Sequence, residues 1–233
     1  MIDSFFQYFS ENDSPSRDLY YEQGGPKKYK RSPIITLPTP DKVTMSLTDS
    51  LMNRRSSRQF GPAPLLLEEM STLLFWAFGE IKKDEKKDYM QHFYPSGGAK
   101  YALEFYPLVL KCDNVPAGVY HYNPRGHVLE HLFWVEHQPL RDSVENQFIS
   151  GASMIVLISF VKSRHILKYG NLGYKLGLLE AGHAAQNMYL LAAARNVGCC
   201  ARGIRNPSDL NVLLTLDGIN ETICYALAIG PLY

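Results

Sequence analysis

The chain has 233 residues, of which 45% are apolar, and its 24 Lys and Arg balance 23 Asp and Glu. A chain of this length and apolar share can bury a large hydrophobic core, as one large domain or two small ones. The near-zero net charge gives no overall field that would attract nucleic acid or an anionic membrane, so neither is expected as a partner.

The four cysteines, Cys112, Cys199, Cys200 and Cys224, are too few and too irregularly spaced for a disulfide framework or a zinc site. Reduced thiols packed inside a cytoplasmic protein are the favoured interpretation. The first residues, MIDSFFQYFSENDS, do not resemble a signal peptide, and the longest apolar run, Ala152 to Val161, is about half of a membrane span. We therefore expect a soluble, cytoplasmic protein.

Residues 1–45 are rich in Tyr, Phe, Pro and charge and show no sustained period. They are expected to form an N-terminal arm that lies on the remaining domain, residues 46–233. Within that domain, Ser46 to Met52 is expected to form a short helix capped by Ser46. A second helix is expected from Leu66 to Phe78, with acidic residues in its first turn, where they suit the helix dipole.

The middle of the chain has the pattern of turns and strands. A tight turn at YPSGGA, residues 94–99, precedes a strand-like run from Phe105 to Cys112. Val119 to Tyr122 and His127 to Phe133 are expected to be the two strands of a hairpin around an NPRG turn. Arg141 to Phe148 is expected to form a short helix.

The stretch from Lys168 to Gly203 organises the rest of the chain. It follows an expected buried strand, Ser153 to Val161, in which apolar residues run without alternation. A Lys-Tyr pair in a glycine-flanked loop leads into the longest helical pattern, Leu172 to Arg195, and a Gly-Cys-Cys turn follows. Because small residues and Leu cover most of its circumference, this helix is expected to be central and buried. Gly177 and Gly182 would allow close packing.

Two further elements complete the fold prediction. Pro207 to Leu216 is expected to be helical, and Glu221 to Gly230 to form a closing strand. Mixed helices and strands, with a hairpin and one buried helix, predict an α+β sandwich built on one central sheet, mixed or antiparallel. No GxGxxG sequence follows a strand and no Walker A sequence is present, so the sequence gives no sign of a Rossmann unit.

Three short segments carry groups that suit chemistry. Arg54 to Arg58 provides three guanidiniums and two hydroxyls, which suit a dianionic phosphate, although a solvated basic loop fits this segment alone. Pro95 to Gly98 would let the backbone approach a flat ligand, although an ordinary turn explains it equally well. Lys168 and Tyr169 pair a potential base with a hydroxyl donor. Most such pairs are surface residues, but burial between a strand and a helix would lower the pKa of Lys168.

The histidines are expected to be structural. Glu180 and His183 lie about one turn apart on the central helix and are interpreted as a hydrogen-bonded buried pair rather than a catalytic dyad. A metal site is not expected, because no second ligand cluster accompanies them. His121, His127 and His131 have strand spacing on the hairpin and are interpreted as surface polar residues.

Five segments, taken together and in order, resemble a known family. RRSSRQF, YPSGGA, GVYHYNP, KYGNLGYKLGLLEAGHAAQN and the final ALAIG resemble the nitroreductase superfamily and, within it, the SagB-type dehydrogenases, which are thiazole- and oxazole-forming peptide oxidases. The resemblance covers roughly Ser46 to Gly230. The LLEAGHAAQN block with KYG upstream is specific to this branch, whereas RRSSR alone indicates only the superfamily.

This resemblance implies an FMN-binding α+β fold that works as an intertwined homodimer with two flavins at the subunit interface. The residues that would hold the FMN phosphate and ribityl chain are Arg54, Arg55, Ser56 and Arg58. Those that would approach the isoalloxazine, from the partner subunit, are Pro95, Ser96 and Gly97. Those that would line the flavin from the other side are Arg202 and Gly203. The active-site pair would be Lys168 and Tyr169.

The implied reaction is the oxidation of azoline rings in a peptide. Aromatising an azoline removes one proton from a ring carbon and one hydride, which would go to flavin N5. We hypothesise that Lys168, neutral in a desolvated site, is the base or tunes one, and that Tyr169 orients the ring or relays the proton. Reduced flavin would pass its electrons to O2. A cyclodehydratase complex is the further partner that this chemistry allows.

Two other functions stay open. One is an NAD(P)H-dependent nitro- or quinone reductase, and the other is a non-catalytic scaffold in a peptide-modifying complex. The residues after the last expected strand, Pro231 to Tyr233, include no basic side chain, whereas many nitroreductases have basic residues there that grip the phosphate. Either Arg54 to Arg58 suffices, helped by Arg202 or Arg205, or flavin binds weakly, as the scaffold function implies.

Overall fold

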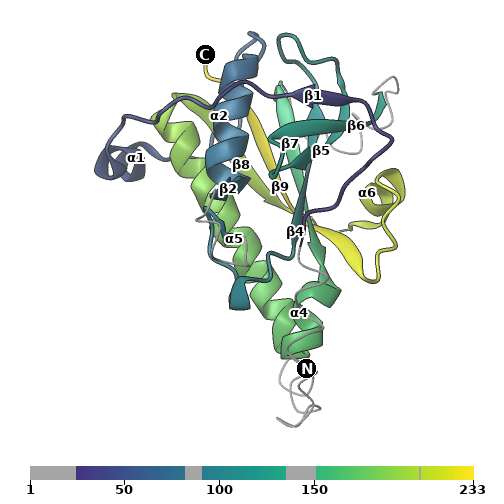
Figure 1. Ribbon diagram of the computed structural model, residues 1–233. Coiled ribbons are helices and arrows are strands. Elements are labelled where there is room, and N and C mark those ends of the chain that lie inside the picture. Colours follow the sequence, from purple (N-terminus) through teal and green to yellow (C-terminus); the bar gives the residue numbers. More distant parts are fainter. Residues whose placement is uncertain (1–24, 82–90, 135–150, 205) are drawn as a thin grey trace.

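The computed structural model describes residues 25–81, 91–134, 151–204 and 206–233, and its largest element is a seven-stranded antiparallel sheet (Figure 1). The strand order is β1-β6-β5-β4-β7-β9-β8. The strands are β1 (Ile34–Thr36), β4 (Leu103–Val109), β5 (Gly118–Asn123), β6 (Val128–Trp134), β7 (Met154–Val161), β8 (Val197–Gly203) and β9 (Glu221–Pro231).

Helices lie on both faces of this sheet (Figure 1). α2 (Leu67–Phe78) and α5 (Leu172–Ala194) cover one face, and α6 (Ser208–Leu213) lies on the other. α1 (Leu47–Asn53) packs against α5, and α4 (Lys162–Tyr169) leads directly into its first turn. The smaller elements are the paired strands β2 (Glu80–Ile81) and β3 (Gln91–His92) and the 3-10 turn η3 (Gly97–Ala99).

Strand alternation divides the core between the two faces. On β4, Phe105 and Val109 join the apolar cluster under α2 and α5, whereas Tyr106 and Leu108 join the cluster on the α6 side. All eight residues of β7 are buried, because helices or loops cover both of its faces. The sheet is therefore the shared wall of two apolar layers.

The predicted α+β architecture is confirmed, and most predicted elements lie where expected. α1 begins after Ser46, whose Oγ accepts a hydrogen bond from the Asp49 N–H at 3.0 Å. α2, the hairpin β5–β6, the buried strand β7, the long helix α5 and the closing strand β9 each overlap their predicted ranges. The helix predicted at Arg141–Phe148 lies outside the described residues.

Two local predictions are wrong. Lys168 and Tyr169 do not lie in a loop but form the last turn of α4, because the helical pattern continues until Gly170, whose φ of +54° ends the helix. The Gly-Cys-Cys segment, Gly198–Cys200, is not a turn but part of β8, because it pairs with Ala228–Gly230 of β9.

The prediction of a buried central helix holds for one side of α5 only. Glycines on the sheet side make room for neighbours: a Cβ at Gly177 would collide with the Phe160 ring, and one at Gly173 would lie 2.8 Å from the His165 carbonyl carbon. Gly182 has open space around its Cβ position. The other side of α5 therefore lacks a packing partner in the described part of the chain.

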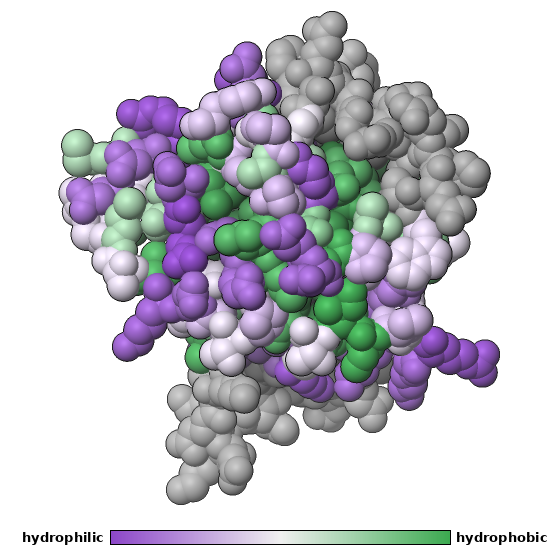
Figure 2. Space-filling view, turned by 90° about the horizontal axis from the view of Figure 1, so that it is seen from above, coloured by the Kyte–Doolittle hydropathy of each residue, from purple (hydrophilic) through white to green (hydrophobic). Residues whose placement is uncertain are grey.

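Apolar side chains reach the surface along these helices. Those on α1 and α5 that are at least 42% exposed are Leu47, Leu51, Met52, Leu172, Tyr174, Leu178 and Leu179. Figure 2 shows hydrophobic groups between hydrophilic ones on the face seen from above. No helix in the described ranges is long and apolar enough to cross a membrane.

A buried ionic network lies on the α6 side of the sheet, and it overturns the prediction that His121 is a surface residue. His121 is fully buried, and its Nε2 and Nδ1 each lie 2.8 Å from a carboxylate, those of Glu104 and Glu130. Arg164 pairs with the other Glu104 oxygen. Successive side chains of a strand point to opposite faces whatever their polarity. His121 can be buried because carboxylates on the two adjacent strands bind both of its ring nitrogens.

The network fixes the protonation of its members. Burial alone would raise the pKa of Glu104, but Arg164 and the hydrogen bond from His121 lower it from 4.5 to about 2. Burial alone would lower the pKa of His121, but hydrogen bonds to Glu104 and Glu130 raise it above its ordinary 6.5. The backbone N–H groups of Lys27 and Tyr29 donate to Glu104 and Glu130, so the network also holds residues 27–29 on the sheet.

Gly177→Ala should lower the free energy of unfolding by about 1–3 kcal/mol, because the new methyl group must displace the buried Phe160 ring. The matched change Gly182→Ala should raise it by up to about 1 kcal/mol, since Ala favours the helix and meets open space. Urea unfolding of dilute protein measures both changes. Equal stability of the two variants would contradict this packing.

The ionic network should make stability depend on pH in a defined window. Glu104, whose pKa is lowered, contributes to stability above about pH 4.5, and this contribution is lost as pH falls toward 2. His121, whose pKa is raised, contributes to stability below pH 6.5, and this contribution is lost as pH rises through the raised pKa. We expect the network to contribute most between pH 4.5 and 6.5.

His121→Gln should lower the free energy of unfolding by about 3 kcal/mol at pH 5.5, because it leaves a buried carboxylate without its cation. It should also flatten the decline of this free energy above pH 6.5. Urea unfolding across pH measures this. His131→Gln, a change of the same residue type on the neighbouring strand, is the control and should leave that decline in place. If the His121 variant lost stability above pH 6.5 as steeply as the parent protein, the pairing would be refuted.

Candidate functional site

The end of α1 brings an arginine and a serine onto a tyrosine of α5. The Arg54 guanidinium lies over the Tyr189 ring, 5.4 Å from its centroid, and Ser56 Oγ lies 3.1 Å from Tyr189 Oη. Arg54 is the C-cap of α1, so the chain leaves the helix at the point where it meets Tyr189. Both Arg54 and Ser56 are half-buried, so each retains a solvent-facing part that an anionic ligand can reach.

The same segment lies along the free edge of β8. The Ser57 N–H donates to Cys199 O at 2.9 Å, and the Ala201 N–H donates to Tyr189 Oη at 2.6 Å. β8 is an edge strand of the main sheet, so its outward backbone groups need partners beyond the sheet. Tyr189 and the segment after α1 supply them, which fixes both segments relative to β8.

The other residues that were expected to hold the flavin at this end differ in their surroundings. Arg202 is half-buried and Gly203 exposed at the end of β8, with open space around the Gly203 Cβ position. Arg55 Nη1 donates to two carbonyls at the end of α1, at 2.7 and 2.8 Å, so this side chain folds back onto its own helix. Arg58 is exposed, and Arg205 lies outside the described residues.

A second group of residues gathers where α4 meets η3. A Cβ at Gly98, whose φ is +62°, would collide with the Tyr169 hydroxyl and lie 3.1 Å from Lys168 Nζ. A glycine is needed there both for the backbone conformation and for this contact. Tyr169 is half-buried but Lys168 is exposed, so the predicted burial of Lys168 is wrong for the single chain: the last turn of α4 faces solvent.

The turn before η3 is anchored to α5. Ser96 Oγ donates to Glu180 Oε2 at 2.5 Å, and a Cβ at Gly97 would lie 3.1 Å from Leu176. Pro95 is exposed at the start of the turn. Because the Ser96 hydroxyl is engaged by Glu180, the turn presents backbone rather than this hydroxyl to any flat ligand.

The predicted pair of Glu180 and His183 is not formed. Glu180 is 1% exposed and its Oε2 lies 2.8 Å from His165 Nε2, whereas His183 is exposed. Three residues advance a helix by about 300°, so His183 lies to the side of Glu180 and outside the core. Sequence spacing on one helix could not reveal the true partner, which comes from α4.

Sequence reasoning missed two residues of these groups. Tyr189 organises the first group, and its signal was a polar-tipped aromatic within a run of small and aliphatic residues. Lys100 follows the PSGGA turn directly. Partial burial and the positive charge of Lys168 lower the pKa of Lys100, so two lysines share the region around η3.

These residues form two separate clusters along α5. The Arg54 cluster (Arg54, Ser56 and Tyr189) lies beside its C-terminal half, and the Lys168 cluster (Ser96, Gly98, Lys168 and Tyr169) lies beside its N-terminal half (Figure 1). On α5, Tyr189 lies nine positions from Glu180, which holds Ser96, and thirteen from Leu176, which lies beside Gly97, so these contact points are about 14 to 20 Å apart along the helix. The single chain therefore holds the two clusters apart.

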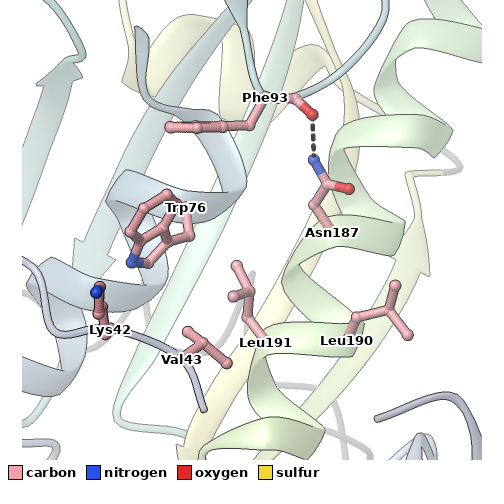
Figure 3. A pocket seen from close by; sticks show the side chains of 7 residues that line it. All are labelled: Lys42, Val43, Trp76, Phe93, Asn187, Leu190 and Leu191. Atoms are coloured by element: carbon pink, nitrogen blue, oxygen red, sulfur yellow. Dashed lines mark hydrogen bonds between the residues drawn. The ribbon is translucent and has the colours of Figure 1, made fainter. Parts of the chain in front are cut away.

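A pocket of about 380 Å³ lies between α2, α5 and the segment before α1 (Figure 3). Asn187 Nδ2 donates to Phe93 O at 3.1 Å across one side of it. Its lining residues are Lys42, Val43, Trp76, Phe93, Asn187, Leu190 and Leu191. Lys42 is the only charged residue among these, so the pocket lacks the several donors that a phosphate needs. It also includes none of the predicted site residues.

Among the described residues, Cys199, Cys224 and the potential metal ligands form no further reactive centre. Burial raises the pKa of Cys199, and burial raises the pKa of Cys224 to about 12, so these thiols stay protonated at neutral pH. Across the described residues, no group of three His, Cys, Asp or Glu side chains could hold a metal ion.

Comparisons with known proteins agree with the fold. The nitroreductase family matches residues 51–231. A protein of Methanocaldococcus jannaschii, MJ1384, named as a candidate nitroreductase, is 32% identical over 179 residues, covering 76% of this chain and 88% of that protein. The microcin B17-processing protein McbC of Escherichia coli is 31% identical over 106 residues, covering 42% of this chain and 39% of McbC.

Solved structures share the architecture at lower identity. A nitroreductase-like protein of Ralstonia eutropha superposes with a TM-score of 0.71 at 24% identity, covering 90% of this chain and 93% of its own. A chain of the Escherichia coli microcin synthetase McbBCD complex, with truncated pro-MccB17 bound, gives 0.65 at 21%, covering 99% and 86%. A nitroreductase-like protein of Desulfovibrio desulfuricans in complex with FMN gives 0.54 at 19%, covering 80% and 86%. At these identities the likeness concerns the fold alone.

Tyr189→Phe should lower the free energy of unfolding by about 1–2 kcal/mol, because the Ala201 N–H loses its acceptor. Hydrogen exchange at the Ala201 amide should quicken. Tyr174→Phe, which removes an exposed hydroxyl from the same helix, is the control and should change neither quantity. Unaltered exchange at Ala201 in the Tyr189 variant would show that this hydroxyl does not hold β8.

Proposed function

This chain belongs to the nitroreductase family of flavin oxidoreductases, and on that premise we propose that it is an FMN-dependent dehydrogenase that oxidises azoline rings of a peptide to azoles. The observation that carries the proposal is the contact of Lys168 and Tyr169 with the turn at Gly98. A potential base and a hydroxyl donor thereby stand at the turn whose glycines suit the approach of a flat ring.

The Arg54 cluster fits the phosphate end of FMN. Arg54 is held over Tyr189 and Ser56 is hydrogen-bonded to it, so a guanidinium and a hydroxyl converge at one place beside the edge of β8. A phosphate is recognised by such charge-assisted donors. Arg58 and Gly203, which are exposed, and Arg202, which is half-buried, would complete this end. Arg55 would have to leave its carbonyl partners to join.

The reaction needs one proton and one hydride removed from the azoline ring. FMN supplies the two-electron acceptor, and O2 takes the electrons afterwards. Lys168 removes the ring proton, and Tyr169 orients the ring or carries that proton onward. Partial burial and the positive charge of Lys168 lower the pKa of Lys100, so a second amine stands beside this pair.

A second copy of the chain would complete the site. The Arg54 and Lys168 clusters meet one α5 at points about 14 to 20 Å apart, while the exposed side of that helix carries Leu172, Leu178 and Leu179. Exposed apolar side chains in a row mark an interface. In a homodimer packed along α5, the Arg54 cluster of one subunit would face the Lys168 cluster of the other. That packing would also cover the exposed Lys168.

The similarity to McbC and to the McbBCD chain supports a peptide as the substrate and a peptide-modifying complex, including a cyclodehydratase, as the partner. The similarity to MJ1384 favours a second candidate function, an NAD(P)H-dependent nitro- or quinone reductase. The two functions differ in what reduces the flavin: an azoline peptide in the first, and a nicotinamide in the second.

Anaerobic stopped-flow absorbance separates these functions. FMN-loaded protein should lose its flavin absorbance on mixing with an azoline-containing peptide and should keep it far longer with NADPH. Rapid bleaching by NADPH with none by azoline peptides would establish the reductase instead. The matching azole peptide, which has no hydride to give, is the control.

Lys168→Ala should slow bleaching by the azoline peptide by roughly 100-fold, because the ring proton loses its acceptor, while the bound flavin remains. Lys30→Ala removes the same side chain from an exposed position of the N-terminal segment and should retain the parent rate. A Lys168 variant as fast as the Lys30 variant would remove Lys168 from the mechanism.

Arg54→Ala should raise the dissociation constant for FMN by about tenfold or more, because one charged donor to the phosphate is lost. Quenching of flavin fluorescence on titration measures it. The loss should be much smaller for riboflavin, which has no phosphate. Arg31→Ala, at an exposed position of the N-terminal segment, is the control. Equal losses for FMN and riboflavin would place Arg54 away from the phosphate.

A further inference from the structure

Glu180 joins three separate segments near the Lys168 cluster. Its Oε2 lies 2.5 Å from Ser96 Oγ and 2.8 Å from His165 Nε2, and its Oε1 accepts the Ala102 N–H at 2.8 Å. The side chain is 1% exposed, so these donors replace the water that an ionised carboxylate requires. One carboxylate on α5 therefore sets the relative position of α4 and of the turn leading into η3.

His165 carries this anchoring to α4. It precedes Lys168 and Tyr169 by one helical turn, and its ring centroid lies 6.1 Å from that of Tyr169. A Cβ at Gly97 would lie 3.3 Å from His165 Cε1, so the imidazole also packs against the turn. The hydrogen bond to Glu180 thereby fixes the rotation of the α4 turn that presents Lys168.

Both sides of the Lys168 contact thus depend on one carboxylate. Ser96 holds the turn that contains Gly98, and His165 holds the helix that contains Lys168 and Tyr169. The two sides meet where Gly98 touches Tyr169 and Lys168. A shift of Glu180 would therefore move Lys168 and Tyr169 relative to the turn that contains Gly98.

A remaining feature distinguishes His165 from a packing residue. The imidazole is fully buried, and its Nδ1 has no hydrogen-bond partner in the described part of the chain. Burying a polar atom without a partner lowers stability, and native structures rarely retain one without a use. An apolar ring would fill the same space without that cost, but it could not bind Glu180.

We infer that Glu180 and His165 are positioning residues for the oxidation, which hold Lys168 and Tyr169 in place against the Gly98 turn. The inference rests on the proposed function, because it takes Lys168 and Tyr169 as the pair that faces the azoline ring. Misplacing a reacting group by about 1 Å can cost about 100-fold in rate without changing how tightly the substrate binds.

Glu180→Gln keeps the shape of the side chain and removes its charge, and we expect it to lower the maximal rate of bleaching by azoline peptide by about 10- to 100-fold. The peptide concentration for half-maximal rate and the reoxidation of reduced flavin by O2 should stay unchanged. Glu221→Gln is the matched control, since Glu221 is also a buried carboxylate that accepts from a serine, Ser159, but lies on the other face of the sheet.

A role in stability alone would overturn the inference: both variants would then lose similar thermal stability while bleaching at similar rates. Should Glu180→Gln not fold, Ser96→Ala removes one of the three donors and leaves the carboxylate in place. It should slow bleaching in the same direction by a smaller factor. A parent rate in folded Ser96→Ala would equally refute the positioning role.

A second measurement needs no substrate and keeps the inference testable if the proposed function fails. Limited acetylation followed by mass spectrometry gives the reactivity of Lys168 relative to the exposed Lys30 in one sample. In Glu180→Gln the ratio should rise by about threefold or more, because Lys168 loses its fixed contact with the turn. It should stay at the parent value in Glu221→Gln. An unchanged ratio in Glu180→Gln would overturn the inference, whatever the protein oxidises.

Discussion

Helix α5 is the constraint on which the rest of the structure depends. Its sheet side packs so closely that Gly177 leaves no space beside Phe160, and Gly173 none beside the backbone at His165. That packing fixes the helix along its length, so the residues that meet the two clusters keep a constant separation of about 14 to 20 Å. Glu180 holds a residue of the Lys168 cluster, and Tyr189 gathers the Arg54 cluster. The geometry of any joint site is therefore set by how two copies of α5 meet.

Much of the fold could be predicted because local patterns determine it. The apolar run of β7, the uninterrupted helical pattern of α5 and the Ser46 cap each reflect one segment's own sequence. The failures involved partners from elsewhere. Cys199 and Cys200 became strand residues because β9 offers an edge, and His121 turned inward because Glu104 and Glu130 lie on the neighbouring strands.

The candidate site was predictable in its parts but not in its arrangement. Arg54 and Ser56 were found from their residue types, whereas the only sign of Tyr189, which gathers them, was a polar-tipped aromatic within a run of small and aliphatic residues. The helical spacing suggested a pair of Glu180 with His183, whereas the partner that the fold provides is His165. Side-chain partners across elements depend on how helices pack, which residue types and spacing along a single element do not encode.

The central claim is that one subunit's Arg54 cluster works with the other subunit's Lys168 cluster, and complementation between two impaired variants tests it most directly. Arg54→Ala and Lys168→Ala chains are mixed and allowed to exchange subunits. They are assayed for azoline-dependent bleaching at an FMN concentration that loads parent sites but not sites with the Arg54 change. The account predicts recovery of about a quarter of the parent activity, since half of the random dimers are mixed and each holds one intact site. No recovery after demonstrated subunit exchange would contradict it.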